Sequence, residues 1–350
     1  MSNEKNTAPT GIRAAQEIKA KKENEPKPLW EIDPDFLNPY KQLQPIQTWA
    51  KMGDRPALPK EGIVTFSAKQ KKGKSLSTYA LVIPLLSGKD FDTLRPTERP
   101  NLVLVFDMEM SETTLVNRVL RQVQTIGEYG TRFVLCPLKA KSIEERMEII
   151  TKKIEKYQPD IAVIDQAAKL AHNINDPVES DTITNKLDKL SIGRAVWVVM
   201  HENKSEGDSN MRGHLGTCLS FAAVENYNVD RKGRIFTITA KDARDTDTED
   251  AAAVRFALDE DGRIIDASVI YREAQAQEVE RYRGNFRMLF ADDATLRSCD
   301  LIERIKSQEG LEERSAKTKI AKAKELGAIR KTSGDRNAPY EVTPENELVH

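Results

Sequence analysis

A glycine, a lysine and a serine lie together between two apolar runs. They close the stretch Ala68–Ser75, which follows Ile63–Phe66 and precedes Leu76–Leu86. The first run has the length of a buried strand, and the second has the length of a helix. Because a loop between a strand and a helix presents its N–H groups and the helix N-terminus to an anion, the stretch is typical of a phosphate-binding loop.

The residues of this loop divide the work of holding a phosphate. Lys74 supplies a point charge, and the Ser75 hydroxyl is a ligand for Mg²⁺. The usual pattern, G-x-x-x-x-G-K-[ST], has glycine where this chain has Ala68, which fits if φ there is negative. A basic surface turn is the alternative for so lysine-rich a stretch. We expect the nucleotide-binding residues to be Ala68, Lys69, Gln70, Lys71, Lys72, Gly73, Lys74, Ser75 and Leu76.

Two carboxylates follow apolar runs that have the character of buried strands. Asp165 ends the run Asp160–Asp165, and Glu109 comes just after Leu102–Asp107. At the edge that carries the phosphate loop, Asp165 would support Mg²⁺. Glu109 would orient and deprotonate the attacking water as a general base. The alternative for Asp165, and for Glu109 or Asp107, is that it caps the helix that follows.

Three basic or titratable residues follow two other strand-like runs. His201 comes after Ala195–Met200, where it would sense a γ-phosphate through a hydrogen bond; a purely structural histidine is the alternative. Lys241 and Arg244 come after Ile235–Ala240. They would reach the γ-phosphate of a neighbouring subunit as an arginine finger does, or they form a solvated edge.

The strand-like runs alternate with segments of helical spacing, which indicates a mainly parallel α/β sheet covered on both faces. The helical segments are Thr113–Ile126, Ile143–Tyr157 and Asp181–Leu190, and Phe133–Cys136 adds a strand. Shorter runs predict an antiparallel extension of the sheet: Phe221–Val229, Arg234–Ala240, Ala253–Leu258 and Ile264–Ile265. The polar stretch Asn203–Gly216, which precedes the first of these runs, is predicted to be a loop.

The two ends of the chain differ from this core. Residues 1–28 have almost no large apolar side chains and predict a disordered tail. The core domain then spans 29–272, with an irregular leading segment up to Leu58. Residues 273–293 predict a linker or connecting helix, and 294–343 predict a small C-terminal domain in the order helix, turn, helix, hairpin, which is the order of a winged helix. Its elements are Leu296–Ser307, a helix capped by Ser315 that runs to Leu326, and the hairpin strands Ile329–Thr332 and Tyr340–Val342.

Composition limits the classes of function. The formal net charge is −1 over 350 residues, so overall charge does not argue for nucleic acid or membrane as a partner. No apolar run approaches about 20 residues, so no membrane span is predicted. Cys136, Cys218 and Cys299 form neither a zinc spacing nor a disulfide framework, so we expect packing residues in a reducing cytoplasm.

Basic residues cluster in the predicted C-terminal helix and hairpin, although the net charge of the chain is close to zero. A basic helix followed by a basic hairpin is typical of a module that contacts duplex DNA, although a winged helix used for protein contact is the alternative. The residues concerned are Arg314, Lys317, Lys319, Lys322, Lys324, Arg330, Lys331 and Arg336.

Several of these stretches together resemble the RecA-like hexameric helicase ATPases. They are Ala68–Ser75, Glu109-Met110-Ser111 with Leu115–Arg118, the Asp165 strand and His201. Phe106–Arg118 is similar to the same segment of DnaB-type replicative helicases. The compact length and Arg212–Gly216 look more like the plasmid RepA-type helicases and their relatives on mobile elements. The resemblance covers about Gly62–Ala267.

This resemblance implies a RecA-like P-loop NTPase core that binds ATP and Mg²⁺. It implies that Glu109 is the catalytic carboxylate and that Lys241 and Arg244 act in trans; we expect Lys74 and His201 to be catalytic residues as well. It also implies a homo-oligomeric ring, such as a hexamer, or a filament, with single-stranded DNA in a channel that Asn203–Gly216 faces, unless that stretch is an ordinary surface loop. We therefore expect a cytoplasmic DNA helicase or translocase. The alternative is an ATP-dependent DNA-binding regulator that does not unwind.

Overall fold

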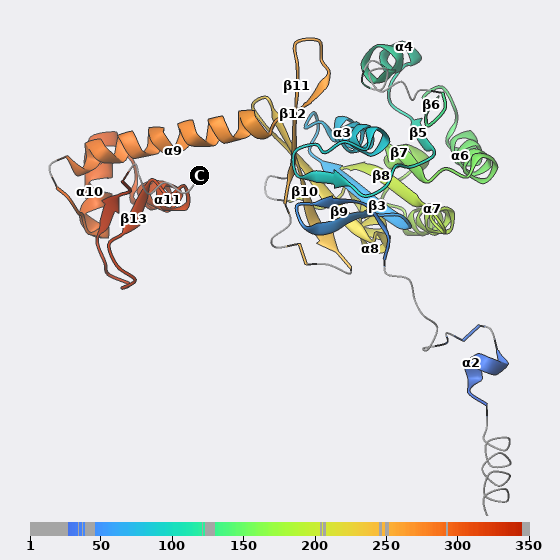
Figure 1. Ribbon diagram of the computed structural model, residues 1–350, viewed down its shortest axis with the longest axis horizontal. Helices are drawn as coiled ribbons and strands as arrows, with labels where there is room; N and C mark the ends of the chain where they lie inside the picture. The colour runs from blue at the N-terminus through green and yellow to red at the C-terminus, as the bar shows by residue number, and fades with distance from the viewer. Residues whose placement is uncertain are drawn as a thin grey trace, which may run out of the picture. The chain divides into compact units, whose positions relative to one another are not determined.

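The computed structural model describes residues 27–33, 35–36, 38, 46–120, 122, 130–203, 205, 208–244, 247–248, 252–291 and 293–344 (Figure 1). The chain divides into two compact units, Met1–Ile46 and Gln47–His350. The first contains the short helix α2, Leu29–Ile32, which begins after Pro28. The tail predicted for residues 1–28 lies outside the described residues except at its last two positions.

Within the described part of the second unit, nine strands form one sheet in the order β12-β11-β10-β9-β3-β8-β7-β5-β6. The strands from β9 to β6 are parallel, and β10, β11 and β12 extend the sheet antiparallel. This confirms the predicted α/β, RecA-like P-loop core with a mainly parallel central sheet. The bounds are β3 Gly62–Ala68, β5 Val103–Asp107, β6 Phe133–Pro137, β7 Ile161–Asp165, β8 Ala195–His201, β9 Glu225–Lys232, β10 Ile235–Ala243, β11 Val254–Leu258 and β12 Ile264–Asp266.

The central strands read as continuous apolar runs because both faces of the sheet are covered. Side chains alternate between the two faces: Val64 and Phe66 enter one hydrophobic cluster, and Ile63 enters the other. The first cluster includes helix α3, Lys74–Ser87. The second includes α6 Ile143–Tyr157, α7 Pro177–Leu190 and α8 Gly213–Ala222 (Figure 1).

The parallel register brings the carboxyl ends of four strands to one edge of the sheet. Asp107 at the end of β5 pairs with Asp165 at the end of β7, and Ala68 at the end of β3 pairs with His201 at the end of β8. The phosphate loop follows β3, and Asp165 ends β7. Because β8 lies between these two strands, a single strand separates the loop from Asp165. This register is what gathers residues that are distant in sequence.

Helix α8 corrects two predictions. The stretch Phe221–Val229 was expected to be one strand, but its first two residues end α8 and β9 begins at Glu225. The predicted loop Asn203–Gly216 likewise ends early, because α8 begins at Gly213. A Cβ added at Gly216, inside this helix, would come within 2.6 Å of the backbone of Met211, which precedes α8. The turn that leads into the helix therefore leaves room only for glycine at this position.

The leading segment up to Leu58 was predicted to be irregular, but it contributes two strands to a small sheet that a later strand completes. Strands β1 Thr48–Met52, β2 Arg55–Pro59 and β4 Leu94–Pro96 form a small antiparallel sheet in the order β2-β1-β4. Arg55 donates to Glu225 at 2.8 Å, and Glu225 also accepts from the Leu58 backbone at 2.9 Å. A buried ion pair therefore attaches this small sheet to β9.

The segment after Glu109 is only partly the helix that was predicted over Thr113–Ile126. Helix α4 spans Glu112–Leu115 and continues as a π-helical turn, η1, over Val116–Leu120. Val123 and Ile126 lie outside the described residues. A π-helical turn in this place is a deviation that helical spacing alone does not predict.

The C-terminal region has its own core. Helix α9, Ser268–Phe290, is continuous, so the connecting segment is helical there. Helices α10 Ser298–Glu309 and α11 Glu313–Glu325 follow, then a hairpin of β13 Ile329–Lys331 and β14 Tyr340–Val342. Leu301, Ile305 and Ile320 pack in its hydrophobic cluster. The cap prediction was wrong: Glu312 occupies the N-cap of α11, and Ser315 lies inside the helix.

None of the helices in the described ranges is both long enough and apolar enough to cross a membrane.

Candidate active site

The phosphate loop joins β3 to α3 as predicted. Gly73 is the N-cap of α3 with φ of 87°, a conformation that favours glycine. An added Cβ there would also lie 2.4 Å from the Phe236 ring, so space as well as φ requires glycine. Ala68, where the usual pattern has glycine, is the last residue of β3 and is not among the described residues with positive φ. Alanine is therefore tolerated at that position.

Two lysines of the loop turn away from it. Lys69 donates to the backbone carbonyls of Asn203, Ser205 and Asp208, the last two at 2.8 and 2.6 Å. Lys72 donates to the Arg231 carbonyl at 2.8 Å and forms an ion pair with Asp230 of β9. The side chains of Lys69 and Lys72 thus brace the loop on both sides, and their role in nucleotide binding stays a prediction.

Lys74 turns the other way and meets the two residues expected to act with it. Its Nζ lies 3.0 Å from His201 Nε2 and 4.0 Å from Glu109 Oε2, and His201 Nε2 lies 4.0 Å from Glu109 Oε1. An ammonium has no acceptor, so Lys74 donates and His201 accepts. Burial lowers the pKa of Lys74, with Glu109 and Asp165 opposing the shift. Burial and the Lys74 charge lower the pKa of His201, which favours its neutral form.

A tight turn holds Glu109 at this place. Asp107 Oδ1 accepts from the backbone N–H of Glu109 at 2.9 Å and of Met110 at 2.6 Å. The side chain of Ser111 caps α4 by accepting from Thr114. The helix cap is thus Ser111 and not Glu109 or Asp107, which leaves the Glu109 carboxylate free to face Lys74.

Asp165 lies behind this group and is 1% exposed. Burial, followed by the neighbouring Asp107 carboxylate, raises the pKa of Asp165 to about 7, while a hydrogen bond from Ser75 opposes the shift. Within the described residues, Asp165 Oδ1 and Asp107 Oδ2 are buried without a hydrogen-bond partner. Two adjacent buried carboxylates and a serine hydroxyl form an all-oxygen donor set, which fits Mg²⁺.

Gln166 is a site residue that the sequence reasoning did not single out. It follows Asp165 with φ of 115° and ψ of 92°, which is strained for a residue with a Cβ. Its Nε2 lies 3.5 Å from Glu109 Oε1. The strained backbone thus aims an amide donor at the candidate general base. No feature of the local sequence indicates this conformation.

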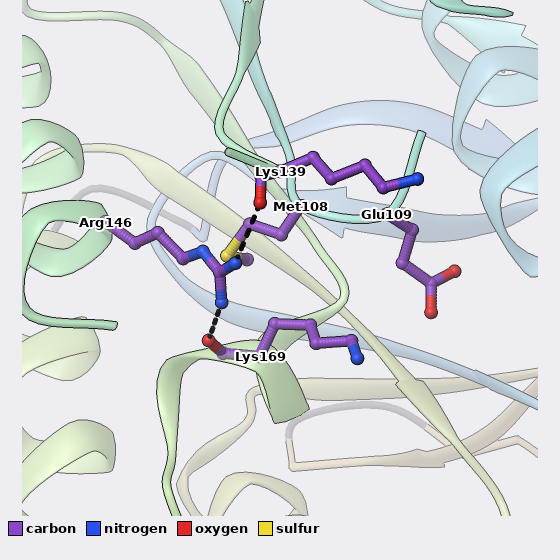
Figure 2. Close-up of a pocket in the computed structure, with 5 residues that line it drawn as sticks. All are labelled: Met108, Glu109, Lys139, Arg146 and Lys169. Atoms are coloured by element: carbon purple, nitrogen blue, oxygen red, sulfur yellow. Dashed lines mark hydrogen bonds between the residues drawn. The ribbon is translucent and has the colours of Figure 1, made fainter. Parts of the chain in front are cut away.

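A cavity of about 530 Å³ adjoins Glu109 (Figure 2). Its lining residues are Met108, Glu109, Lys139, Arg146 and Lys169. Arg146 on α6 donates to the carbonyls of Leu138 at 3.2 Å, Lys139 at 3.1 Å and Lys169 at 2.8 Å. It thereby joins the turn after β6 to the 3₁₀ turn η2, Ala167–Leu170.

Sequence reasoning missed these cations. Lys139 and Lys169 are exposed, and no ion pair joins either one to a carboxylate in the described part of the chain. Both follow strand ends, the same signal that identified Glu109 and Asp165. The sequence contains that signal for the lysines, but the Arg146 bonds that join their two turns exist only in the folded chain.

The structure separates Lys241 from Arg244. Lys241 lies inside β10 and not after the strand as predicted, and its Nζ contacts the segment after β8 that Lys69 of the phosphate loop also contacts. Strand β10 is antiparallel to β9, and Ala243 at its end is level with Glu225, which is level with Val64. Arg244 therefore lies toward the opposite edge of the sheet. It donates to the backbone carbonyls of Phe221 and Ala222, and Lys241 lies 3.3 Å from the Ser209 carbonyl. A role for them in trans stays a prediction.

Comparison with known proteins identifies a family for this chain. The family described as "AAA domain" matches residues 26–207, which is more than half of the chain. No curated protein matches the sequence. Among solved structures, a KaiC-like protein from the hyperthermophilic archaeon Pyrococcus horikoshii OT3 is 12% identical, with a TM-score of 0.44 over 63% of this chain and 99% of that chain. On the extent of the family match, the chain belongs to the AAA domain family.

Proposed function

We propose that this protein hydrolyses ATP at the edge of the sheet where β3, β5, β7 and β8 end. The observation that carries the proposal is the convergence of Lys74, Glu109 and His201 within 4.0 Å, with Asp165 buried behind them. A cation for the phosphate, a carboxylate for the water and an acid for the metal are the parts that phosphoryl transfer to water requires.

Each residue then has a defined task. The loop N–H groups and Lys74 hold the β- and γ-phosphates, which moves the Lys74 ammonium away from His201 and Glu109. Glu109, held by the Asp107 turn, orients a water and accepts its proton. Neutral His201 would hydrogen-bond the γ-phosphate. Ser75 and Asp165 would hold Mg²⁺, which neutralises charge on the phosphates when bound.

We propose further that hydrolysis serves movement along nucleic acid, with a DNA helicase or translocase as the preferred form. Lys139 and Lys169 beside Glu109 support this, because exposed cations attract a phosphate backbone and stand next to the residue that activates water. Lys69 supports it too, since its side chain joins the phosphate loop to the polar segment after β8. A bound strand at either place can thus influence the site.

Two parts of the proposal concern assembly and the C-terminal region. A ring of subunits, such as a hexamer, would let Lys241 and Arg244 approach a neighbour's nucleotide, and the position of Arg244 away from its own phosphate loop supports this. The helix-helix-hairpin order of α10, α11, β13 and β14 supports a winged helix that contacts DNA.

The test measures ATP turnover of the full chain with and without single-stranded DNA, together with strand displacement from a forked duplex and molecular size with and without ATP. We expect DNA to stimulate turnover, strands to separate and ATP to favour a larger assembly. DNA binding with unstimulated turnover and no displacement would instead establish the alternative, an ATP-dependent DNA-binding regulator. Absence of ATP turnover under every condition would contradict the enzymatic proposal itself.

A further inference from the structure

A second group of side chains with metal-ligand chemistry lies on helices α7 and α8. Asp181, His214 and Cys218 place one ligand atom each within 4.8 Å of one another. His214 and Cys218 are four residues apart on α8, so they share one face of that helix. Asp181 comes from α7, which packs against α8.

The ligand atoms of the three side chains already lie close to one another without a metal ion. The Cys218 thiol donates to Asp181 Oδ1 at 3.4 Å. Asp181 and His214 are exposed and Cys218 is half-buried, so a cation can enter from solvent. Bonds of about 2.0–2.3 Å to nitrogen, sulfur and oxygen place the ligands of a tetrahedral zinc about 3–4 Å apart. Small side-chain rotations would therefore close the group around one ion.

We propose that Asp181, His214 and Cys218 bind a zinc-type divalent cation, with water as the fourth ligand. The set contains one nitrogen, one sulfur and one oxygen ligand, which favours Zn²⁺ or Co²⁺ over Mg²⁺ or Ca²⁺ because thiolate and imidazole are borderline to soft ligands. This site is chemically distinct from the oxygen-lined site at Asp165. The spacing was not recognised in the sequence because His214 and Cys218 share a face only if Gly213–Ala222 is a helix.

Metal binding here would fasten α7 to the first turns of α8. That end of α8 is joined to the nucleotide edge, since the Arg212 N–H donates to the His201 carbonyl at 2.8 Å. The Leu215 N–H donates to the Ile174 carbonyl at 2.9 Å, in the segment that precedes α7. A bound cation would therefore restrain the backbone that follows His201.

The experiment titrates the full chain, expressed without a histidine tag and treated with a chelator, with Co²⁺. Wild-type protein should bind one Co²⁺ per chain that shows tetrahedral d–d bands together with a thiolate-to-cobalt charge-transfer band, and added Mg²⁺ should occupy the oxygen-lined site at Asp165. Cys218→Ser should lose the charge-transfer band. His214→Ala and Asp181→Asn should weaken binding about tenfold or more, since the ligands act together.

Matched controls replace the same residue types elsewhere: Cys299→Ser, His172→Ala and Asp188→Asn should bind Co²⁺ as wild type does. Zn²⁺ should raise the melting temperature of wild-type protein and of these controls, but not of the site variants. Absence of stoichiometric binding to wild type, or a charge-transfer band that persists in Cys218→Ser, would overturn the proposal. Circular dichroism and ATP binding verify that each variant is folded.

Discussion

Two lysine-bearing regions of this molecule differ in what surrounds their charge. At the sheet edge, Lys139 and Lys169 lie beside Glu109, and within the described residues no carboxylate pairs with either. On α11, Lys317 pairs with Glu313 at 2.5 Å and Lys322 pairs with Glu325 at 3.1 Å. Lys319 and Arg330 are likewise paired, with Glu309 and Glu341.

This difference shows why counting basic residues is a poor guide to a binding surface. Ion pairs on an exposed helix are worth only about 0.3–0.5 kcal/mol, but they cancel much of the field that a phosphate backbone would experience. The sequence has more lysines on α11 than at the sheet edge. In the described residues, four basic side chains of the C-terminal region are paired with carboxylates, whereas Lys139 and Lys169 beside Glu109 form no ion pair within 4.0 Å.

The largest expected effect tests whether the sheet edge is catalytic. Glu109→Gln removes the proton acceptor while keeping the shape and the Asp107 turn, so ATP turnover should fall by about 10²–10⁴-fold. ATP should remain bound, because Lys74 and the loop are unchanged. Turnover and nucleotide binding are measured separately. Glu112→Gln on α4 is the control and should retain activity; a fully active Glu109→Gln would remove the catalytic assignment.

The next effect compares the two regions directly. Replacing Lys139 and Lys169 together by Ala should weaken single-stranded DNA binding about tenfold and lower the salt slope by about two, because two phosphate contacts are lost. Replacing Lys317 and Lys322 together should change affinity by less than about twofold, since both are already paired. Fluorescence anisotropy at several salt concentrations measures both. The opposite ranking would assign DNA binding to α11.

A smaller effect tests communication between the phosphate loop and the polar segment after β8. Lys69→Met removes the donor to Ser205 and Asp208 but keeps most of the side-chain volume. Basal turnover should stay near wild type, while stimulation by single-stranded DNA should fall about fivefold, the lower end of typical coupling between sites. Lys71→Met in the same loop is the matched control. Equal loss of basal and stimulated turnover would mean that Lys69 serves nucleotide binding instead.

The smallest effect concerns the residue that positions the two sheet-edge lysines. Arg146→Ala removes donors to three carbonyls and should lower the free energy of unfolding by about 1–2 kcal/mol. DNA affinity should fall by only about twofold, since both lysines remain. Urea unfolding and anisotropy measure the two quantities. An unchanged stability would show that the carbonyls find other partners.

The local sequence was sufficient for features that depend on neighbours along the chain. Apolar runs of strand length predicted β3, β5, β7 and β8, and the residues after them predicted the phosphate loop, Glu109, Asp165 and His201. The strand predictions are confirmed because parallel strands covered on both faces must be apolar, and the polar residues that follow them meet at one edge for the same reason. The roles of those residues stay predictions. Ala68 fits for a local reason as well, since it still belongs to the strand.

Only the tertiary structure decided the features that depend on packing between distant segments. The Met211 backbone requires glycine at position 216 inside α8, and that helix aligns His214 with Cys218. The antiparallel direction of β10 carries Arg244 away from its own phosphate loop. In each case the deciding contact joins elements that local propensity treats separately, so sequence spacing alone does not contain it.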